Sequence, residues 1–218
     1  MPASRRALVF SLMALAATPA LAAGKNDFDI YVRAPDFNAA DKARIAKATA
    51  YLQNLGAANG RFEQTDFRNR VTQGNWYLSR PGKMRFEYDP PSSLLIVSDG
   101  NQVKMWDPRL QSLDSYPLSE TPLSLFLARQ IRFDLGVIVT QVTSNANGFT
   151  LKARDRRKQV EGFVMLGFNQ APDGSVSLRE WTVVDQQGRP TTVKLVSFQR
   201  DSVAKADLFV LNKSQAKK

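Results

Sequence analysis

Acid–base chemistry in this chain would have to come from its carboxylates. The sequence contains no histidine, the commonest general base and metal ligand, and no cysteine, so thiol nucleophiles and structural zinc are excluded as well. Glu63 with Asp66, and Glu87 with Asp89, are the pairs that could share a proton. Side chains alternate along a strand, so Glu87 and Asp89 lie on the face opposite Phe86, toward solvent. Because nucleophile elbows, phosphate-binding glycine loops and regular calcium loops are also missing, we predict a non-enzymatic protein without catalytic residues, metal or cofactor.

An arginine occupies the apolar face of a predicted strand. In the stretch NWYLSRPGKMRFEY (75–88), Trp76, Leu78 and Arg80 share one face. The two large apolar side chains indicate that this face is buried, and a buried guanidinium without partners is costly. Either Arg80 donates hydrogen bonds to a specific partner, or its stem lies on the apolar face while its head reaches water at the strand end.

The elements that must position these residues begin with a helix over 36–56. Asn38 can cap it, with Asp41 three residues later as in a capping box, and Gly56 ends it. Such a one-sided helix must lie on an apolar surface. Its apolar face is predicted to consist of Ile45, Ala48, Leu52 and Leu55.

From Arg61 onward the apolar pattern has period two, and short strands follow one another through tight turns such as Asp99-Gly100. We predict a mainly β protein with helices (α+β), built on a curved antiparallel sheet. The inward residues of this sheet either fill a core or leave room for an apolar ligand. They are predicted to be Phe62, Trp76, Leu78, Met84, Phe86, Tyr88, Val97, Met105, Val164, Leu166, Phe168, Trp181 and Val183.

The stretch ETPLSLFLARQ (120–130) interrupts the strands. Thr121 is predicted to cap a helix whose first position is Pro122. This helix is apolar nearly all round, so it is either a core helix or a lid over an apolar cavity. Its apolar residues are Leu123, Leu125, Phe126, Leu127 and Ala128.

The N-terminus is typical of a secretory signal. Two arginines precede the short apolar run ALVFSLMALAA, and small residues follow it, so cleavage is expected near Ala22 or Ala23. We therefore predict a cleaved signal over 1–23 and a single exported, soluble domain over 24–218. Without a cysteine the signal cannot be that of a lipid-anchored protein.

The formal net charge of +10 favours anionic partners, which after export are lipid headgroups, envelope polymers or acidic proteins and not nucleic acid. The most basic stretch, KARDRRKQ, runs from Lys152 through Lys158 to Gln159. Three interpretations of it remain open: a solvated loop, a sheet edge blunted against aggregation, or a contact with an acidic membrane or partner.

Four blocks occur in an order and spacing that resemble the LolA family of periplasmic outer-membrane lipoprotein carriers in Gram-negative bacteria. They are RFEQTDF, GNWYLSRPGKMRFEY, LLIVSDGNQVKMWDP and TPLSLFLARQ, and with the flanking helix and strands the resemblance covers 36–209. Toward the C-terminus, ADLFVLNKSQAKK keeps an apolar piece with strand character but lacks the Pro-Gly-containing tail usual in the family.

The resemblance implies an unclosed β-barrel with an N-terminal amphipathic helix and a helical lid over an apolar cavity. It also implies a periplasmic monomer that accepts acylated lipoproteins from an inner-membrane ABC transporter. The carrier would shield the acyl chains and deliver them to the outer membrane, either to a receptor there or directly.

The family's arginine in the Arg-Pro motif matches Arg80, which is then expected to donate to carbonyls of the lid near Leu125–Ala128, or to the long helix, and so hold the empty form closed. The lid would comprise Leu123, Leu125, Phe126, Leu127 and Ala128. The cavity wall would comprise Phe62, Trp76, Leu78, Met84, Phe86, Val97, Met105 and Trp181.

Two other functions remain open beside the lipoprotein carrier. The same fold would suit an envelope sensor or regulatory lipid-binding module, although the known regulator of this kind has a second domain for which this chain has no room. It would equally suit a carrier of another amphiphile, such as a phospholipid or glycolipid, because acyl chains look alike to an apolar wall.

Overall fold

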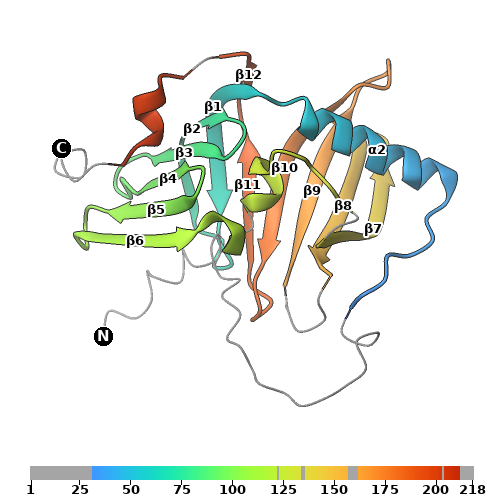
Figure 1. Cartoon of the computed structure of the whole chain (residues 1–218), viewed down its shortest axis with the longest axis horizontal. Coiled ribbons are helices and arrows are strands. Elements are labelled where there is room, and N and C mark those ends of the chain that lie inside the picture. Colours follow the sequence, from blue (N-terminus) through green and yellow to red (C-terminus); the bar gives the residue numbers. More distant parts are fainter. Residues whose placement is uncertain (1–30, 122, 134–135, 157–161, 203, 212–218) are drawn as a thin grey trace. The chain divides into compact units, whose positions relative to one another are not determined.

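The computed structural model describes residues 31–121, 123–133, 136–156, 162–202 and 204–211, and the side chains of Leu125 and Phe126 are not described. The predicted signal segment over 1–23 lies outside the described residues. Within the described ranges, twelve strands form one sheet in the order β6-β5-β4-β3-β2-β1-β11-β10-β9-β8-β7, with β12 paired to β1, which confirms a mainly β protein (Figure 1). The chain divides into two compact units.

The first unit contains residues up to Leu52 and from Ile131 to Thr192. The second contains Gln53–Gln130 and the chain from Val193 onward. The elements of the first unit are α2 (Ala39–Gln53), β7 (Val137–Asn145), β8 (Gly148–Asp155), β9 (Phe163–Gln170), β10 (Val176–Val184) and the start of β11 (Pro190–Leu195). Those of the second are β1 (Ala57–Thr65), β2 (Val71–Ser79), β3 (Lys83–Tyr88), β4 (Leu95–Asp99), β5 (Gln102–Asp107), β6 (Ser112–Pro117), η2 (Leu118–Glu120), α3 (Ser124–Leu127), the end of β11, β12 (Gln199–Arg200) and η3 (Ala206–Phe209).

Helix α2 starts where its cap was predicted. The Asp41 N–H donates to Asn38 Oδ1 at 2.8 Å, while the Asp41 carboxylate accepts from the Asn38 side-chain amide at 3.0 Å. A regular capping box would instead use the backbone N–H of the cap residue. The helix ends at Gln53, a little before Gly56. Its buried residues are Ala48, Tyr51 and Leu52, followed by buried Leu55, whereas Ile45 is only half-buried.

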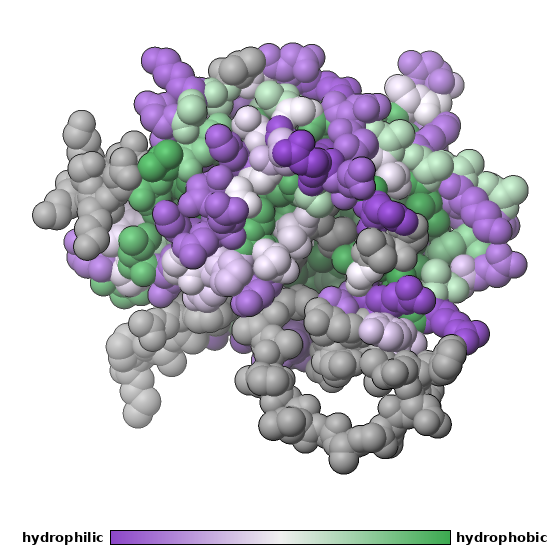
Figure 2. Space-filling view, in the orientation of Figure 1, coloured by the Kyte–Doolittle hydropathy of each residue, from purple (hydrophilic) through white to green (hydrophobic). Residues whose placement is uncertain are grey.

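In the first unit, α2 crosses the strands over their apolar face (Figure 1). The ring of Tyr51 meets Phe168 of β9 edge to face at 6.2 Å, and Lys47 Nζ donates to the Gly174 carbonyl at 3.0 Å. The outer side of α2 carries charged residues interspersed with alanines (Figure 2). The register places the covered residues on one face, namely Phe149, Leu151, Ala153, Val164, Leu166, Phe168, Trp181 and Val183.

The second unit has its own apolar face across β1–β5. In the register, Trp76 lies opposite Phe86, and Ile96 lies opposite both Phe86 and Met105. Residues directly opposite in antiparallel strands share a face. We call this set the β1–β5 apolar face; all its members are buried, and they are Phe62, Trp76, Leu78, Met84, Phe86, Tyr88, Ile96 and Met105.

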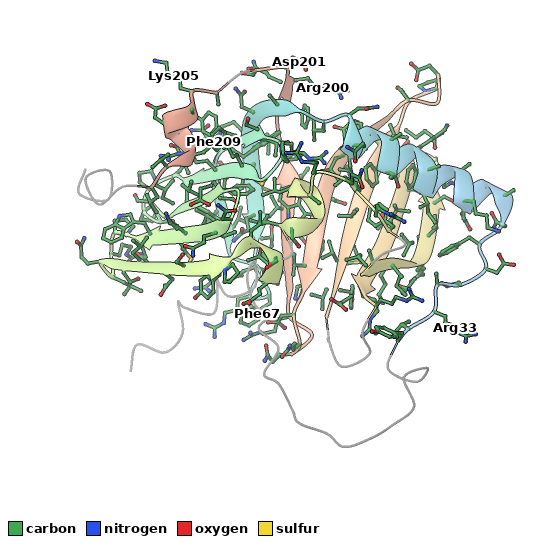
Figure 3. The ribbon with its side chains drawn as sticks, in the orientation of Figure 1. Arg33, Phe67, Arg200, Asp201, Lys205 and Phe209 are labelled. Atoms are coloured by element: carbon green, nitrogen blue, oxygen red, sulfur yellow. The ribbon has the colours of Figure 1, made fainter. Side chains whose placement is uncertain are left out.

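The prediction for Val97 is wrong. Val97 lies opposite Arg85, so it points to the other side of the sheet, and Ile96 takes the predicted position. Val97 is nevertheless 1% exposed because η3 lies against β3 and β4 on that side. Figure 3 shows Phe209 of η3 beside these strands.

Two elements differ from the predictions in type or extent. The helix predicted from Thr121 is a single turn, Ser124–Leu127, and its cap position is Leu123, without a side-chain hydrogen bond. Thr121 Oγ1 donates instead to the Leu118 carbonyl at 2.9 Å. The C-terminal piece with strand character folds as the 3₁₀ helix η3, because its carbonyls pair locally and at Leu208 with Arg85.

Candidate functional site

Arg80 lies at the end of β2, with its backbone N–H bonded to the Gly56 carbonyl at 2.7 Å. Its half-buried guanidinium donates through Nη2 to the Ala128 carbonyl at 2.5 Å and, at 3.5 Å, through Nη1 to the Leu55 carbonyl. Burial lowers the pKa of Arg80 from its ordinary value. A guanidinium stays protonated in proteins, so these bonds are charge-assisted.

Three consecutive carbonyls, beginning with that of the last residue of α3, each accept from a different donor. The Gly82 N–H reaches the Leu127 oxygen at 2.9 Å, Arg80 reaches Ala128, and Gln53 Nε2 reaches the Arg129 oxygen at 2.9 Å. The last carbonyls of a helix have no partner within it. These three donors, all in the second unit, therefore fasten the end of α3 to the turn after β2 and to Gln53.

The start of the same segment satisfies its polar groups internally. Thr121 bonds to Leu118, and Ser124 Oγ donates to the Thr121 carbonyl at 2.8 Å. Leu123 and Leu127 are buried, at 2% and 1% exposure, while the side chains of Leu125 and Phe126 lie outside the described part of the chain. The segment 123–129 thus combines buried leucines with a small set of hydrogen bonds at its C-terminal end.

The β1–β5 apolar face is rich in aromatic side chains with one polar pair among them. Phe62 meets both Phe86 and Tyr88 edge to face at 5.0 Å. The Tyr88 hydroxyl donates to Gln64 Oε1 at 2.7 Å, and burial raises the pKa of Tyr88 well above its ordinary value. The face is therefore an apolar wall whose buried hydroxyl is paired.

The carboxylates that could have done acid–base work each have their own partner. Glu87 Oε1 accepts from Arg85 Nε at 2.6 Å, and Asp89 is held by Arg61. Asp66 belongs to the β1–β2 turn, while Glu63 accepts from Gln73 at 3.1 Å. Within the described ranges, no group of three or more acidic side chains could hold a metal ion.

The structure brings Arg80 together with the Ala128 carbonyl. It also places Phe62, Trp76, Leu78, Met84, Phe86 and Met105 on one face of the same unit. Trp181 belongs to the apolar face of the other unit. The sequence reasoning missed Gln53 and Gly82, since a glutamine at the end of a helix and a backbone N–H in a turn leave no periodic signal.

Comparison with known proteins places the chain in a family. The family model described as outer membrane lipoprotein carrier protein LolA matches residues 53–212, most of the chain. The chain belongs to the LolA family. Proteins of this family are carriers, and the chain is a binding protein and not an enzyme.

Individual relatives are similar at a lower level. An outer-membrane lipoprotein carrier protein of Methylobacillus flagellatus is 28% identical over 168 residues, which cover 72% of this chain and 78% of that protein. One from Xylella fastidiosa is 29% identical over 174 residues, 75% of this chain and 81% of that protein. A LolA superfamily protein of Nitrosomonas europaea has a crystal structure that aligns with a TM-score of 0.43 at 10% identity, covering 78% of this chain and 97% of that chain. Among the described helices of this protein, none is long and apolar enough to cross a membrane.

Proposed function

We propose that this LolA-family protein is a periplasmic carrier of acylated lipoproteins. It accepts them from an inner-membrane ABC transporter as a monomer and delivers them to the outer membrane, where a receptor or the membrane itself receives them. The family match over 53–212 carries this proposal. The apolar wall and the fastened segment in the second unit support it, because a carrier needs a surface that can be covered and uncovered.

The acyl chains are proposed to lie on the β1–β5 apolar face. Its aromatic and methionine side chains suit a flexible apolar ligand, since these residues adapt their packing. The first unit offers a second apolar surface that includes Trp181. Ile96 belongs to the proposed binding residues, and Val97 does not, because the register places Val97 on the other side of the sheet.

The segment 123–129 is proposed to act as a lid, with Arg80 as its latch. A charge-assisted hydrogen bond contributes about 1.5–3 kcal/mol and a neutral one about 0.5–1.5 kcal/mol. Each buried CH₂ of an acyl chain contributes about 0.8 kcal/mol, so a few chains outweigh the bonds from Arg80, Gln53 and Gly82. The latch therefore favours the closed empty form without trapping cargo irreversibly.

A carrier of another amphiphile is the second candidate. An apolar wall does not distinguish the acyl chains of a lipoprotein from those of a phospholipid or glycolipid. A sensor module with the same fold would bind such a ligand without passing it on.

A release assay tests the proposal. Spheroplasts that make a labelled lipoprotein are incubated with the purified mature chain, and the supernatant is searched for a one-to-one complex. The wild type should release lipoprotein and pass it to outer membranes. Arg80→Leu should accept the lipoprotein but transfer less of it, whereas Arg109→Leu, a change of an exposed arginine in the β5–β6 turn, should behave like the wild type. Extraction of phospholipid or glycolipid without any lipoprotein would overturn the cargo assignment.

A further inference from the structure

Arg156 directly follows β8 in the first unit, and two backbone hydrogen bonds hold it in place. The Arg156 N–H donates to the Gly136 carbonyl at 2.8 Å, and its carbonyl accepts from the Val32 N–H at 2.7 Å. Its guanidinium lies over the ring of Tyr31, with 5.5 Å between its central carbon and the ring centroid. Both residues face outward, because Arg156 is exposed and Tyr31 is 43% exposed.

A second cation on the same strand is held in the same way. Lys152 Nζ lies 4.0 Å from the ring centroid of Phe163, the first residue of β9. The register pairs Lys152 with Met165, so Lys152 points away from the face that Leu151 and Leu166 share. Arg156 directly follows β8, and its N–H bond to Gly136 continues the pairing of Asp155 with Val137, so the alternation along β8 continues to Arg156 and places it on the side of Lys152.

Arg33 adds a third charge two residues after Tyr31 in the chain. It is exposed, and Figure 3 shows its side chain pointing away from the strands. In the part of the chain that the structure describes, none of Arg33, Lys152 and Arg156 forms a salt bridge with a carboxylate. Their charges are therefore available to an outside anion. We call Arg33, Lys152 and Arg156, with Tyr31 and Phe163, the basic-aromatic patch.

We propose that the basic-aromatic patch docks the protein on an anionic phospholipid surface. Phosphate headgroups complement three unneutralised cations, and each cation near an anionic bilayer adds to the attraction. Tyr31 has the amphipathic ring that is favoured at the level of the headgroups. The cations lie over rings and not against carboxylates, so binding to headgroups breaks no ion pair.

A membrane suits these residues better than an acidic protein does. Recognition of protein carboxylates usually relies on arginines that bind both oxygens in a fixed geometry, with acidic groups placed to match. Here one of the three cations is a lysine, a point charge on a flexible stem, and apolar ring surface is presented together with the charge. A fluid layer of phosphates satisfies such a patch without matched geometry. Docking at either membrane would bring the carrier close to its donor or acceptor.

Vesicle sedimentation with the mature chain tests this inference. Vesicles of phosphatidylcholine alone, and vesicles with equal parts of phosphatidylcholine and phosphatidylglycerol, are mixed with the empty protein at low and physiological salt. The patch variant carries Arg33→Gln, Lys152→Gln and Arg156→Gln. The control variant carries Lys42→Gln, Lys194→Gln and Lys205→Gln, three exposed lysines elsewhere, so both variants lose the same net charge.

The wild type should bind the anionic vesicles and not the neutral ones, with binding that weakens in salt. Each cation at the surface changes partitioning by about fivefold, so the patch variant should bind about 100-fold more weakly than the wild type. The control variant should stay within about fivefold of the wild type.

Three results would overturn the inference. Equal losses in the two variants would show that only net charge matters. No binding of wild type to anionic vesicles would reject the membrane outright, and capture by polyglutamate without vesicle binding would assign the patch to an acidic protein instead. Because the assay uses empty protein, its failure would leave the proposed lipoprotein carriage untouched, and failure of lipoprotein release would leave the patch untouched.

Discussion

Arg80 donates to the Ala128 carbonyl across 48 positions of the chain, and this bond is the middle one of three contacts to consecutive carbonyls, between that of Gly82 to Leu127 and that of Gln53 to Arg129. The donor is charged and half-buried, while the acceptor is a helix-end carbonyl that lacks a partner within its own helix. The hydrogen bond thus offsets the cost of removing both the guanidinium and the carbonyl from water. Because its donor is charged, we expect this contact to be the strongest of the three.

Arg80→Leu should loosen the 123–129 segment more than Gln53→Ala does. Loss of a charge-assisted bond should raise amide exchange at Leu127 and Ala128 by about 10- to 100-fold, and loss of the neutral Gln53 bond by about 2- to 10-fold. Hydrogen exchange followed by mass spectrometry measures both. Amides of β3 serve as the internal control and should exchange at the wild-type rate. Equal effects of the two substitutions would show that the charge on Arg80 adds nothing.

The sequence could predict only those contacts of this site that affect the order of polar and apolar residues along the chain. Strand parity and the cost of burying a guanidinium leave two possibilities for Arg80, a specific partner or a head that reaches water, and only the resemblance points to carbonyls near Ala128. The role as a latch stays a prediction. The Gln53 and Gly82 contacts could not be predicted from the order of polar and apolar residues. Each uses a single polar group whose partner is determined by tertiary packing.

The error at Val97 has a physical cause in its neighbours. The run Leu94, Leu95, Ile96, Val97 is apolar at every position, so alternation cannot say which residues face which way. Pairing with β3 decides it, and the C-terminal segment then buries Val97 on the other side. This C-terminal segment forms the 3₁₀ helix η3, whereas its sequence predicts a strand. A short apolar run does not distinguish the two.

Arg85→Leu should release the C-terminal segment from β3. Arg85 is 8% exposed and donates through Nη1 to the Leu208 carbonyl at 2.9 Å, while Nε binds Glu87. Without the guanidinium, this carbonyl has lost a charge-assisted partner worth about 1.5–3 kcal/mol. Limited proteolysis should then cut near Phe209 faster, by about 10- to 100-fold if cleavage follows local opening.

The matched control for that prediction is Lys83→Leu. Lys83 begins the same strand, is half-buried and pairs with Asp99 in the register; unlike Arg85, it donates no hydrogen bond to the described residues of the C-terminal segment. Its cleavage pattern near Phe209 should match the wild type. An unchanged pattern in Arg85→Leu would mean that the buried side chains of Phe209 and Leu211 hold the segment by themselves.

Gly60→Ala and Gly74→Ala should both destabilise the second unit. The two glycines lie opposite Trp76 and Phe62, whose rings cover them, and a Cβ at either would stand 2.0 Å from a backbone oxygen, that of Ser197 or Glu87. Backbone cannot yield as a side-chain tip can, so we expect a loss of about 1–3 kcal/mol. This loss in the free energy of unfolding is measured by urea unfolding, with the hydrogen exchange of the β1 and β2 amides as the signal.

Gly56 provides the control, because a Cβ there would meet nothing within 4 Å. Gly56→Ala should be neutral or more stable by about 0.4–1 kcal/mol, since it reduces the entropy of the unfolded chain. If Gly60→Ala is as stable as Gly56→Ala, the close approach of Ser197 is not rigid, and the strand can shift to admit a side chain.

The stability contributed by the β1–β2 turn should depend on pH through Asp66. Its Oδ1 accepts from the N–H groups of Arg68 and Arg70 at 2.9 and 2.8 Å, and its Oδ2 accepts from Arg70 Nε at 2.9 Å. Burial alone would raise the pKa of Asp66, but the bonds from Arg70 and Arg68 outweigh it, so the pKa lies below its ordinary value. A lowered pKa means that the folded state favours the carboxylate. Its contribution is complete above the ordinary pKa of about 3.9 and is lost as pH falls through the lower folded value.

Asp66→Asn should therefore lower the free energy of unfolding by about 1.5–3 kcal/mol at neutral pH. The gap to the wild type should narrow below about pH 4, where Asp66 of the unfolded wild type takes up a proton, until the folded carboxyl is protonated as well at its lower pKa. Urea midpoints of the two proteins across this range measure the gap. Asp114→Asn on β6 changes a carboxylate outside the turn and should show no such narrowing. A gap that stays constant down to the lowest pH would mean that the shape of the turn, and not the charge of Asp66, provides the stability.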